Sequence, residues 1–167
     1  MAKVGDDCSP QSYYYAFSEE PFEEVLKFIG FKMERMDPDC VEGRFIVNEK
    51  SCQPFGVLHG GMSALIAETL ASTGAVIASG FQRVAGVQLT INHVKAAPIG
   101  TEVVASAKPM HLGQRTHVWD VTLTRSDSSA DVNSQGSRIA LGRVTLMIDP
   151  LGSKVKDDQQ LVPRARL

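Results

Sequence analysis

Residues 60–79, GGMSALIAETLASTGAVIAS, decide the fold of this chain. The stretch contains no proline, and Glu68 is its single charged residue. It is apolar on nearly every side, and a helix of that kind is buried instead of lying at a surface. Its many alanine, serine and glycine residues suit the close approach of a surrounding sheet. The stretch therefore predicts one long helix enclosed by the rest of the domain.

Strand-like runs lie on both sides of this helix. Alternation of apolar residues predicts two strands before it, with a turn at Pro38-Asp39, and four strands after it. A short helix between Pro21 and Gly30 carries an apolar stripe of Phe22, Val25, Leu26 and Ile29. The expected strands cover residues 31–36, 40–48, 87–93, 101–110, 117–123 and 139–148.

Short connections between consecutive strands indicate an antiparallel sheet. The expected fold class is α+β, with a curled antiparallel sheet wrapped around the long helix. In the last run, Ile139 and Leu141 are one residue out of phase with Val144, Leu146 and Ile148, which predicts a bulge near Gly142. Residues 1–20 are expected to form a lead, 21–150 one domain with a polar connection at 125–137, and 151–167 a tail.

Composition excludes several classes of function. A chain of 167 residues has the length of a single domain. The net charge of −2 gives no general attraction to nucleic acid or to an anionic membrane, and no apolar run is expected to reach the roughly 18 residues of a membrane span. The three cysteines form no CxxC pair, and the four histidines form no ligand cluster, so neither a metal nor another cofactor is expected.

Glu68 is the first candidate for chemistry. An ionised carboxylate in an apolar helix is costly unless it is paired or faces a cavity. Ser72 follows four residues later on the same helical face. The pair suits a carboxylate that acts as nucleophile or base, with a hydroxyl that holds water. The alternative is an ordinary helix glutamate turned to solvent.

The start of the helix supplies the second group of candidates. Gly60 and Gly61 open it, where backbone N–H groups have no partner within the helix and favour developing negative charge. Glycine also lets a ligand approach the backbone closely. Gln53 and His59 stand just upstream with polar side chains. Together these residues suit an oxyanion hole for acyl transfer, although His-Gly-Gly alone could be only a flexible helix entry.

The run Gln53…Gly-Val-Leu-His59-Gly60-Gly61…Leu65…Glu68-Thr69 resembles the signature of the hotdog-fold thioesterases. The branch that it resembles contains the aromatic acyl-CoA and 1,4-dihydroxy-2-naphthoyl-CoA thioesterases. Two later runs, residues 86–95 and 108–119, are similar to the same branch. The resemblance covers about residues 30–150, and it implies hydrolysis of an acyl-CoA thioester.

The resemblance also implies a role for each site residue. Glu68 matches the catalytic carboxylate, and Gly60 matches the residue whose N–H polarises the thioester carbonyl. Gln53 matches the side chain that orients that carbonyl, His59 a histidine near the leaving thiolate, and Ser72 the hydroxyl that assists the hydrolytic water. Nucleophilic and general-base roles of Glu68 stay open.

The resemblance further implies how substrate is held. His93, which could instead be a core or interface histidine, and Lys95 match strand-end contacts to coenzyme A. The family assembles its site between two subunits, so a homodimer or homotetramer is expected. The complete set of expected substrate contacts is Gly61, Gly86, His93, Lys95, His111, Leu112, Gly113, Gln114 and Arg115.

Two other functions compete with hydrolysis. A hotdog-fold enoyl-CoA hydratase or dehydratase would share the architecture, but this chain lacks the hydratase pattern. A non-catalytic acyl-CoA-binding module would not need Glu68 together with Gln53 and Gly60. The acyl group, aromatic or aliphatic, stays open at this point.

The last three residues, Ala165-Arg166-Leu167, are similar to peroxisomal signals of the Ser-Lys-Leu type. A peroxisomal location and contact with an import receptor are therefore expected, with the cytoplasm as the alternative. Plants place the dihydroxynaphthoyl-CoA step of phylloquinone biosynthesis in peroxisomes, so this address would favour that substrate.

Overall fold

The computed structural model describes residues 23–126 and 138–149. Within these ranges the order is one helix, two strands, one long helix and four strands, which confirms the predicted order and fold class. The expected lead, the tail with Ala165–Leu167 and nearly all of the 125–137 connection lie outside the described residues. The elements are α2 (Glu23–Ile29), β1 (Lys32–Asp37), β2 (Cys40–Ile46), α3 (Gly60–Ala78), β3 (Val84–His93), β4 (Glu102–Leu112), β5 (Thr116–Arg125) and β6 (Arg138–Ile148).

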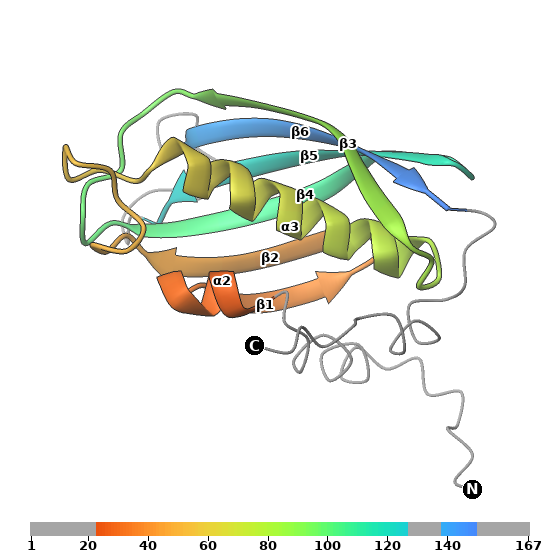
Figure 1. Cartoon of the computed structure of the whole chain (residues 1–167), viewed down its shortest axis with the longest axis horizontal. Coiled ribbons are helices and arrows are strands. Elements are labelled where there is room, and N and C mark those ends of the chain that lie inside the picture. The colour runs from red at the N-terminus through yellow and green to blue at the C-terminus, as the bar shows by residue number, and fades with distance from the viewer. Residues whose placement is uncertain (1–22, 127–137, 150–167) are drawn as a thin grey trace, which may run out of the picture.

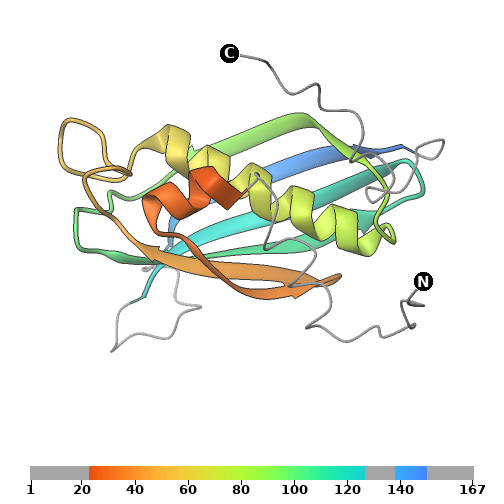
Figure 2. The same ribbon diagram turned by 60° about the horizontal axis from the view of Figure 1, so that its bottom comes forward.

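The described strands form one antiparallel sheet in the order β1-β2-β4-β5-β6-β3. The sheet curls around α3, which runs along its concave side (Figure 1). Seen from a second direction, α2 lies on the same side of the sheet as α3 (Figure 2). The two edge strands are β1 and β3, and most residues of β3 are exposed. The sheet therefore leaves a ten-residue edge next to the long helix.

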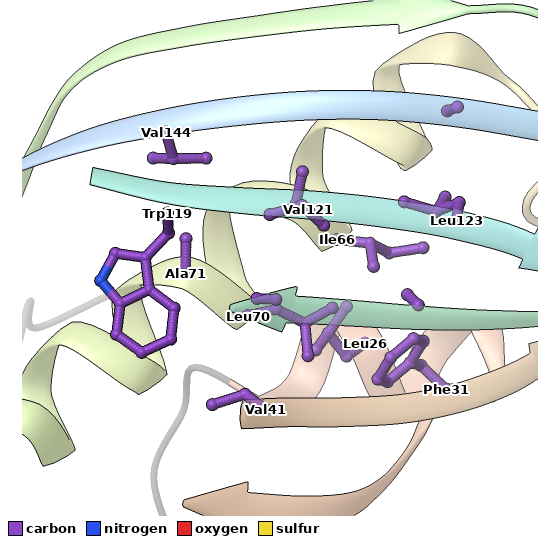
Figure 3. Close-up of a cluster of buried hydrophobic side chains, with 14 of the residues drawn as sticks. Leu26, Phe31, Val41, Ile66, Leu70, Ala71, Trp119, Val121, Leu123 and Val144 are labelled. Carbon is purple, nitrogen blue, oxygen red and sulfur yellow. The ribbon is translucent and has the colours of Figure 1, made fainter. Parts of the chain in front are cut away.

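The core lies between α3 and the sheet (Figure 3). Ile66, Leu70 and Trp119 are completely buried there. A side chain at Gly74 would overlap the Trp119 ring, so glycine lets the helix lie directly on the indole. This contact fixes how deeply α3 sits in the sheet, as the predicted enclosure requires.

By length and composition alone, α3 could cross a membrane, because its 18-residue window has a mean hydropathy of 1.4. The prediction that no segment reaches this threshold was therefore wrong. Most of that window is buried inside the domain. The hydropathy reflects a core helix, since the apolar side chains contact the sheet.

Two local predictions were also wrong. Gly142 pairs regularly with Ile91 and Val121, and the register of β6 against β5 shifts instead next to Ile139, which is buried together with Ala140. Ile139 and Ala140 follow one another and both face the core, so the alternation of inward and outward side chains changes phase at this bulge. In α2, only part of the predicted apolar stripe is buried, since Val25 is 49% exposed.

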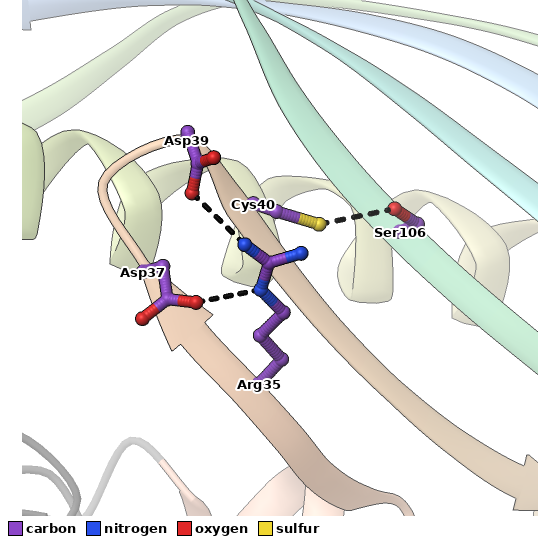
Figure 4. A network of polar contacts seen from close by, with 5 residues as sticks. All are labelled: Arg35, Asp37, Asp39, Cys40 and Ser106. Carbon is purple, nitrogen blue, oxygen red and sulfur yellow. Dashed lines mark hydrogen bonds and ion pairs between the residues drawn. The ribbon is translucent and has the colours of Figure 1, made fainter. Parts of the chain in front are cut away.

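The predicted turn at Pro38-Asp39 joins β1 to β2. Arg35 bonds the carboxylates of Asp37 at 2.6 Å and Asp39 at 3.2 Å across this turn (Figure 4). The Cys40 thiol lies 3.7 Å from the Ser106 hydroxyl of β4. Exposed ion pairs of this kind contribute little to stability, so the pairing of β1 and β2 depends mainly on their backbone bonds.

Candidate active site

His59 caps the start of α3. Its backbone is extended (φ −69°, ψ 128°), and its Nδ1 accepts a hydrogen bond from the Gly61 N–H at 2.9 Å. A ring nitrogen that accepts this bond carries no proton, so in neutral His59 the proton sits on Nε2. The Gly60 N–H has no partner among the described residues. Of the two glycine amides, only that of Gly60 is thus left for a ligand.

A cavity of about 490 Å³ opens at this end of the helix. Gln53, His59, Gly60, His93 and Lys95 contribute to its wall. The His93 ring packs against Gly60, and its Cε1 would lie 3.1 Å from any Cβ at that position. His93 is exposed at the end of β3, which excludes the alternative of a core histidine. Because residue 60 has no side chain, its backbone N–H stays accessible beside the imidazole rings of His59 and His93.

Glu68 lies further along α3 and faces the edge strand β3. The side chain is half-buried and makes no ion pair or hydrogen bond with another described residue. Burial raises the pKa of this carboxyl. A Cβ at Gly86 would overlap the carboxylate, so glycine provides the space that Glu68 occupies. The register of β3 shifts just beyond, between Gly86 and Gln88.

Hydroxyl groups near Glu68 differ in what they bond. Thr69 donates to the Leu65 carbonyl at 2.9 Å, and Thr73 donates to the Thr69 carbonyl at 2.8 Å. The half-buried Ser72 makes no such bond within the described chain. Its hydroxyl, one turn beyond Glu68, is therefore available to water or substrate.

The predicted catalytic residues form two groups within one chain. Gln53, His59 and Gly60 meet at the first cavity, whereas Glu68 and Ser72 do not line it. Glu68 lies eight positions after Gly60, which corresponds to about 12 Å along a helix axis. A single chain therefore does not bring the free amide and the carboxylate to the same carbonyl group.

The predicted coenzyme A contacts are divided as well. His93 and Lys95 lie at the first cavity, while residues 112–114 line a second cavity of about 430 Å³ at the opposite end of α3. His111 and Arg115 flank that loop with exposed side chains. The Gly61 N–H donates to His59 and is not available to coenzyme A. Gly86 contacts Glu68 and lines neither cavity.

Sequence reasoning missed two polar residues of the second cavity, Gln82 and His117. Each has a buried polar atom without a partner in the described structure. His117 begins the predicted strand 117–123 and is buried together with Trp119. No pattern singled out Gln82, because it follows the helix in an irregular segment.

Comparison with known proteins places this geometry in a family. The sequence profile of the Thioesterase superfamily matches residues 55–131. A relative from Arabidopsis thaliana, 1,4-dihydroxy-2-naphthoyl-CoA thioesterase 2, is 43% identical over 136 residues, which are 81% of this chain and 86% of the relative. The chain belongs to the thioesterase superfamily. It is an acyl-CoA thioester hydrolase, as the resemblance predicted.

Other thioesterases support this placement. The 1,4-dihydroxy-2-naphthoyl-CoA hydrolase of Escherichia coli is 37% identical over 100 residues, covering 59% of this chain and 73% of the relative. The crystal structure of a mutant of thioesterase PA1618 from Pseudomonas aeruginosa superposes with a TM-score of 0.68 at 26% identity, covering 86% of this chain and 95% of that one. The curled sheet and central helix are thus the architecture of hotdog thioesterases.

Proposed function

We propose that this thioesterase hydrolyses an aromatic acyl-CoA of the 1,4-dihydroxy-2-naphthoyl-CoA type to the free acid and coenzyme A. The observation that carries the proposal is the half-buried carboxylate of Glu68, which has no protein partner among the described residues. A desolvated, unpaired carboxylate is costly to the fold and useful for attack on a carbonyl carbon. Two relatives named for dihydroxynaphthoyl-CoA support this acyl group.

The free amide of Gly60 and the side chain of Gln53 polarise the thioester carbonyl. Both belong to the wall of one cavity, and donors aimed at the oxygen stabilise it as negative charge develops. Glu68 then either attacks the carbonyl carbon or removes a proton from the water that attacks it. In the first case water hydrolyses the resulting anhydride. In both cases the C–S bond breaks and the sulfur leaves as thiolate.

His59 is suited to meet that thiolate. Its Nδ1 is held by the Gly61 N–H, so Nε2 is the atom that carries a proton toward the cavity. Ser72 orients the hydrolytic water through the hydroxyl that makes no bond within the described chain. The cap thus fixes both the tautomer and the position of the ring.

A second copy of the chain completes the site in this proposal. Gly60 and Glu68 are about 12 Å apart along one helix, whereas an oxyanion donor and a nucleophile act on one carbonyl. The exposed edge strand β3 carries Gly86 and, through it, borders Glu68. Two copies that meet at this edge would bring the carboxylate of one to the Gly60 amide of the other. His111 and Arg115 of one copy, which flank the second cavity, and His93 and Lys95 of the other would then share one molecule of coenzyme A.

The direct test is a panel of acyl-CoA esters assayed for thiol release. We expect 1,4-dihydroxy-2-naphthoyl-CoA to give a higher kcat/KM than straight-chain acyl-CoA esters. Equal or faster hydrolysis of straight-chain esters would contradict the aromatic assignment. Hydration of an enoyl-CoA without release of thiol would contradict the whole proposal.

Replacement of Gln53 by alanine is expected to lower kcat more than it raises KM. Polarisation matters most as charge develops on the carbonyl oxygen, so the expected loss of kcat is about 10- to 10³-fold, as for one oxyanion-hole donor. Steady-state kinetics on the best substrate measure both constants. An unchanged kcat with a raised KM would reduce Gln53 to substrate positioning.

Mixing two impaired variants tests the shared site. Glu68→Gln and Gln53→Ala chains, unfolded and refolded together in equal amounts, form hybrid dimers. In a two-fold dimer with shared sites, each hybrid holds one intact site, so activity should return to about a quarter of the native value. The same variants refolded separately and then combined are the control. Absence of any recovery in the co-refolded sample would show that each site is built from one chain.

A further inference from the structure

The second cavity combines two buried hydrogen-bond acceptors that have no donor among the described residues. It lies where α3 ends, and its wall includes Ser79, Gln82 and His117. The Nδ1 of His117 and the Oε1 of Gln82 are both buried without a partner in the described structure. Buried polar groups are normally satisfied. Two exceptions in one cavity indicate that something else supplies the donors.

The protonation state of His117 determines whether its free ring nitrogen donates or accepts a hydrogen bond. Its side chain is buried, with 4% exposed. Burial lowers the pKa of His117, the bond to the Gly113 backbone raises it, and nearby His111 lowers it again. The Gly113 carbonyl takes the proton of Nε2, since Nδ1 has no partner in the part of the chain that the structure describes. Nδ1 of the neutral ring therefore offers a lone pair.

The wall of the cavity is uncharged and combines polar with apolar side chains. The described residues of its wall include no lysine, arginine, aspartate or glutamate, and Leu112 and Ile148 contribute apolar surface. Such a wall does not suit a phosphate, which needs cationic or multiple N–H partners. It suits a neutral group that carries a hydrogen-bond donor on an apolar body, such as a ring hydroxyl.

The sheet register relates this cavity to the carboxylate of Glu68. Gly86, which contacts Glu68, pairs with Leu146 on β6, and Leu146 pairs with His117 on β5. Directly opposed residues lie on one face of a sheet. Two strand spacings separate Gly86 from His117, or about 10 Å. Ser79 also follows Glu68 by eleven residues, close to three full helical turns, so both lie on one side of α3.

We propose that His117 and Gln82 form a specificity subsite that accepts hydrogen bonds from hydroxyl groups on the acyl moiety of the substrate. This inference rests on the proposed function, because it assumes that the acyl carbonyl lies at Glu68. The spacing of about 10 Å between Gly86 and His117 suits an aromatic acyl group whose carbonyl lies at Glu68 and whose hydroxyl group points into the cavity. Discrimination arises because an analogue without the hydroxyl would leave the two acceptors buried and unpaired.

The test compares two substrates that differ only in ring hydroxyls, 1,4-dihydroxy-2-naphthoyl-CoA and 2-naphthoyl-CoA. The native enzyme should prefer the hydroxylated ester. Gln82→Met, which keeps the size of the side chain, and His117→Leu should each lower kcat/KM for that ester at least about tenfold. Their kcat/KM for 2-naphthoyl-CoA should stay within about twofold, so this ester is the matched control for each variant. If His117→Leu does not fold by thermal melting, Gln82→Met alone decides.

The alternative donors are the amide N–H groups of the pantetheine arm of coenzyme A. If the cavity held that arm, the two variants would lose kcat/KM equally for both esters, and free coenzyme A would inhibit them less strongly. That result would overturn the subsite. Unchanged kinetics on both esters, or a native enzyme without preference, would also overturn it. A native enzyme that releases no thiol from either ester would instead refute the proposed function, so the two failures are distinguishable.

Discussion

Replacement of Glu68 by glutamine is expected to lower kcat by at least about 10³-fold, the scale on which loss of a central catalytic group registers. The change keeps the size of the side chain and removes only the charge, so the geometry against Gly86 is retained. Steady-state kinetics with thiol detection measure the loss. A folded variant with nearly native kcat would contradict the role of Glu68.

Glu68→Gln should lower the activity of the enzyme without lowering the stability of its fold. Burial raises the pKa of Glu68 in the folded chain above its unfolded value, so the folded state binds a proton more tightly. Stability from this group is therefore gained as the pH falls through the folded pKa and is missing above it. Glu68→Gln should accordingly unfold at the same or a slightly higher temperature at neutral pH. The native rate should also fall off on the acid side at a pH above the ordinary range of a glutamate, about 4.3.

Replacement of Gly86 by alanine is expected to cost about 10²-fold in kcat, comparable to a misplacement of a reacting group by about 1 Å. The new methyl would occupy the position of the Glu68 carboxylate. The carboxylate is the free end of a flexible side chain, so it should move aside while the fold is preserved. Thermal melting and kinetics on one sample separate the two effects.

A double variant shows whether this effect passes through Glu68. If Gly86→Ala acts by displacing the carboxylate, adding it to Glu68→Gln should lower the residual rate little further. Strictly additive losses would mean that Gly86 acts independently, for example by admitting substrate to β3. The cycle thus distinguishes a positioning role from direct contact.

The elements of this fold were predictable because their signals are local. One stretch without proline, apolar on nearly all sides, predicted α3, and alternation predicted the strands that carry the buried residues Val103, Trp119 and Val121. The bulge was predicted near Gly142 but lies at Ile139, because the register of β6 depends on its pairing with two other strands. Such pairing joins residues far apart in sequence, and periodicity within one strand does not reveal it.

The candidate site could be predicted from the sequence as a set of residues, whereas their arrangement could not. Glu68, Gly60 and His59 stood out through composition and motif, yet the division of labour between two adjacent glycines depends on one hydrogen bond to His59. The contact between Glu68 and Gly86 crosses from helix to edge strand. The acceptors at Gln82 and His117 became visible only when the fold showed which buried atoms lacked donors.

The contact of Gly74 with Trp119 has a consequence for protein engineering. No side chain fits between them, so α3 is fixed to the sheet about one turn before its end. Larger residues at position 74 would overpack this contact and lower the stability of the fold. In the proposed arrangement the cavity at the start of the helix holds the thioester and the cavity at its end holds the acyl group, so the two can be reshaped separately. Altered substrate range should therefore be sought in diversity at the helix ends, with residues 74 and 119 held constant.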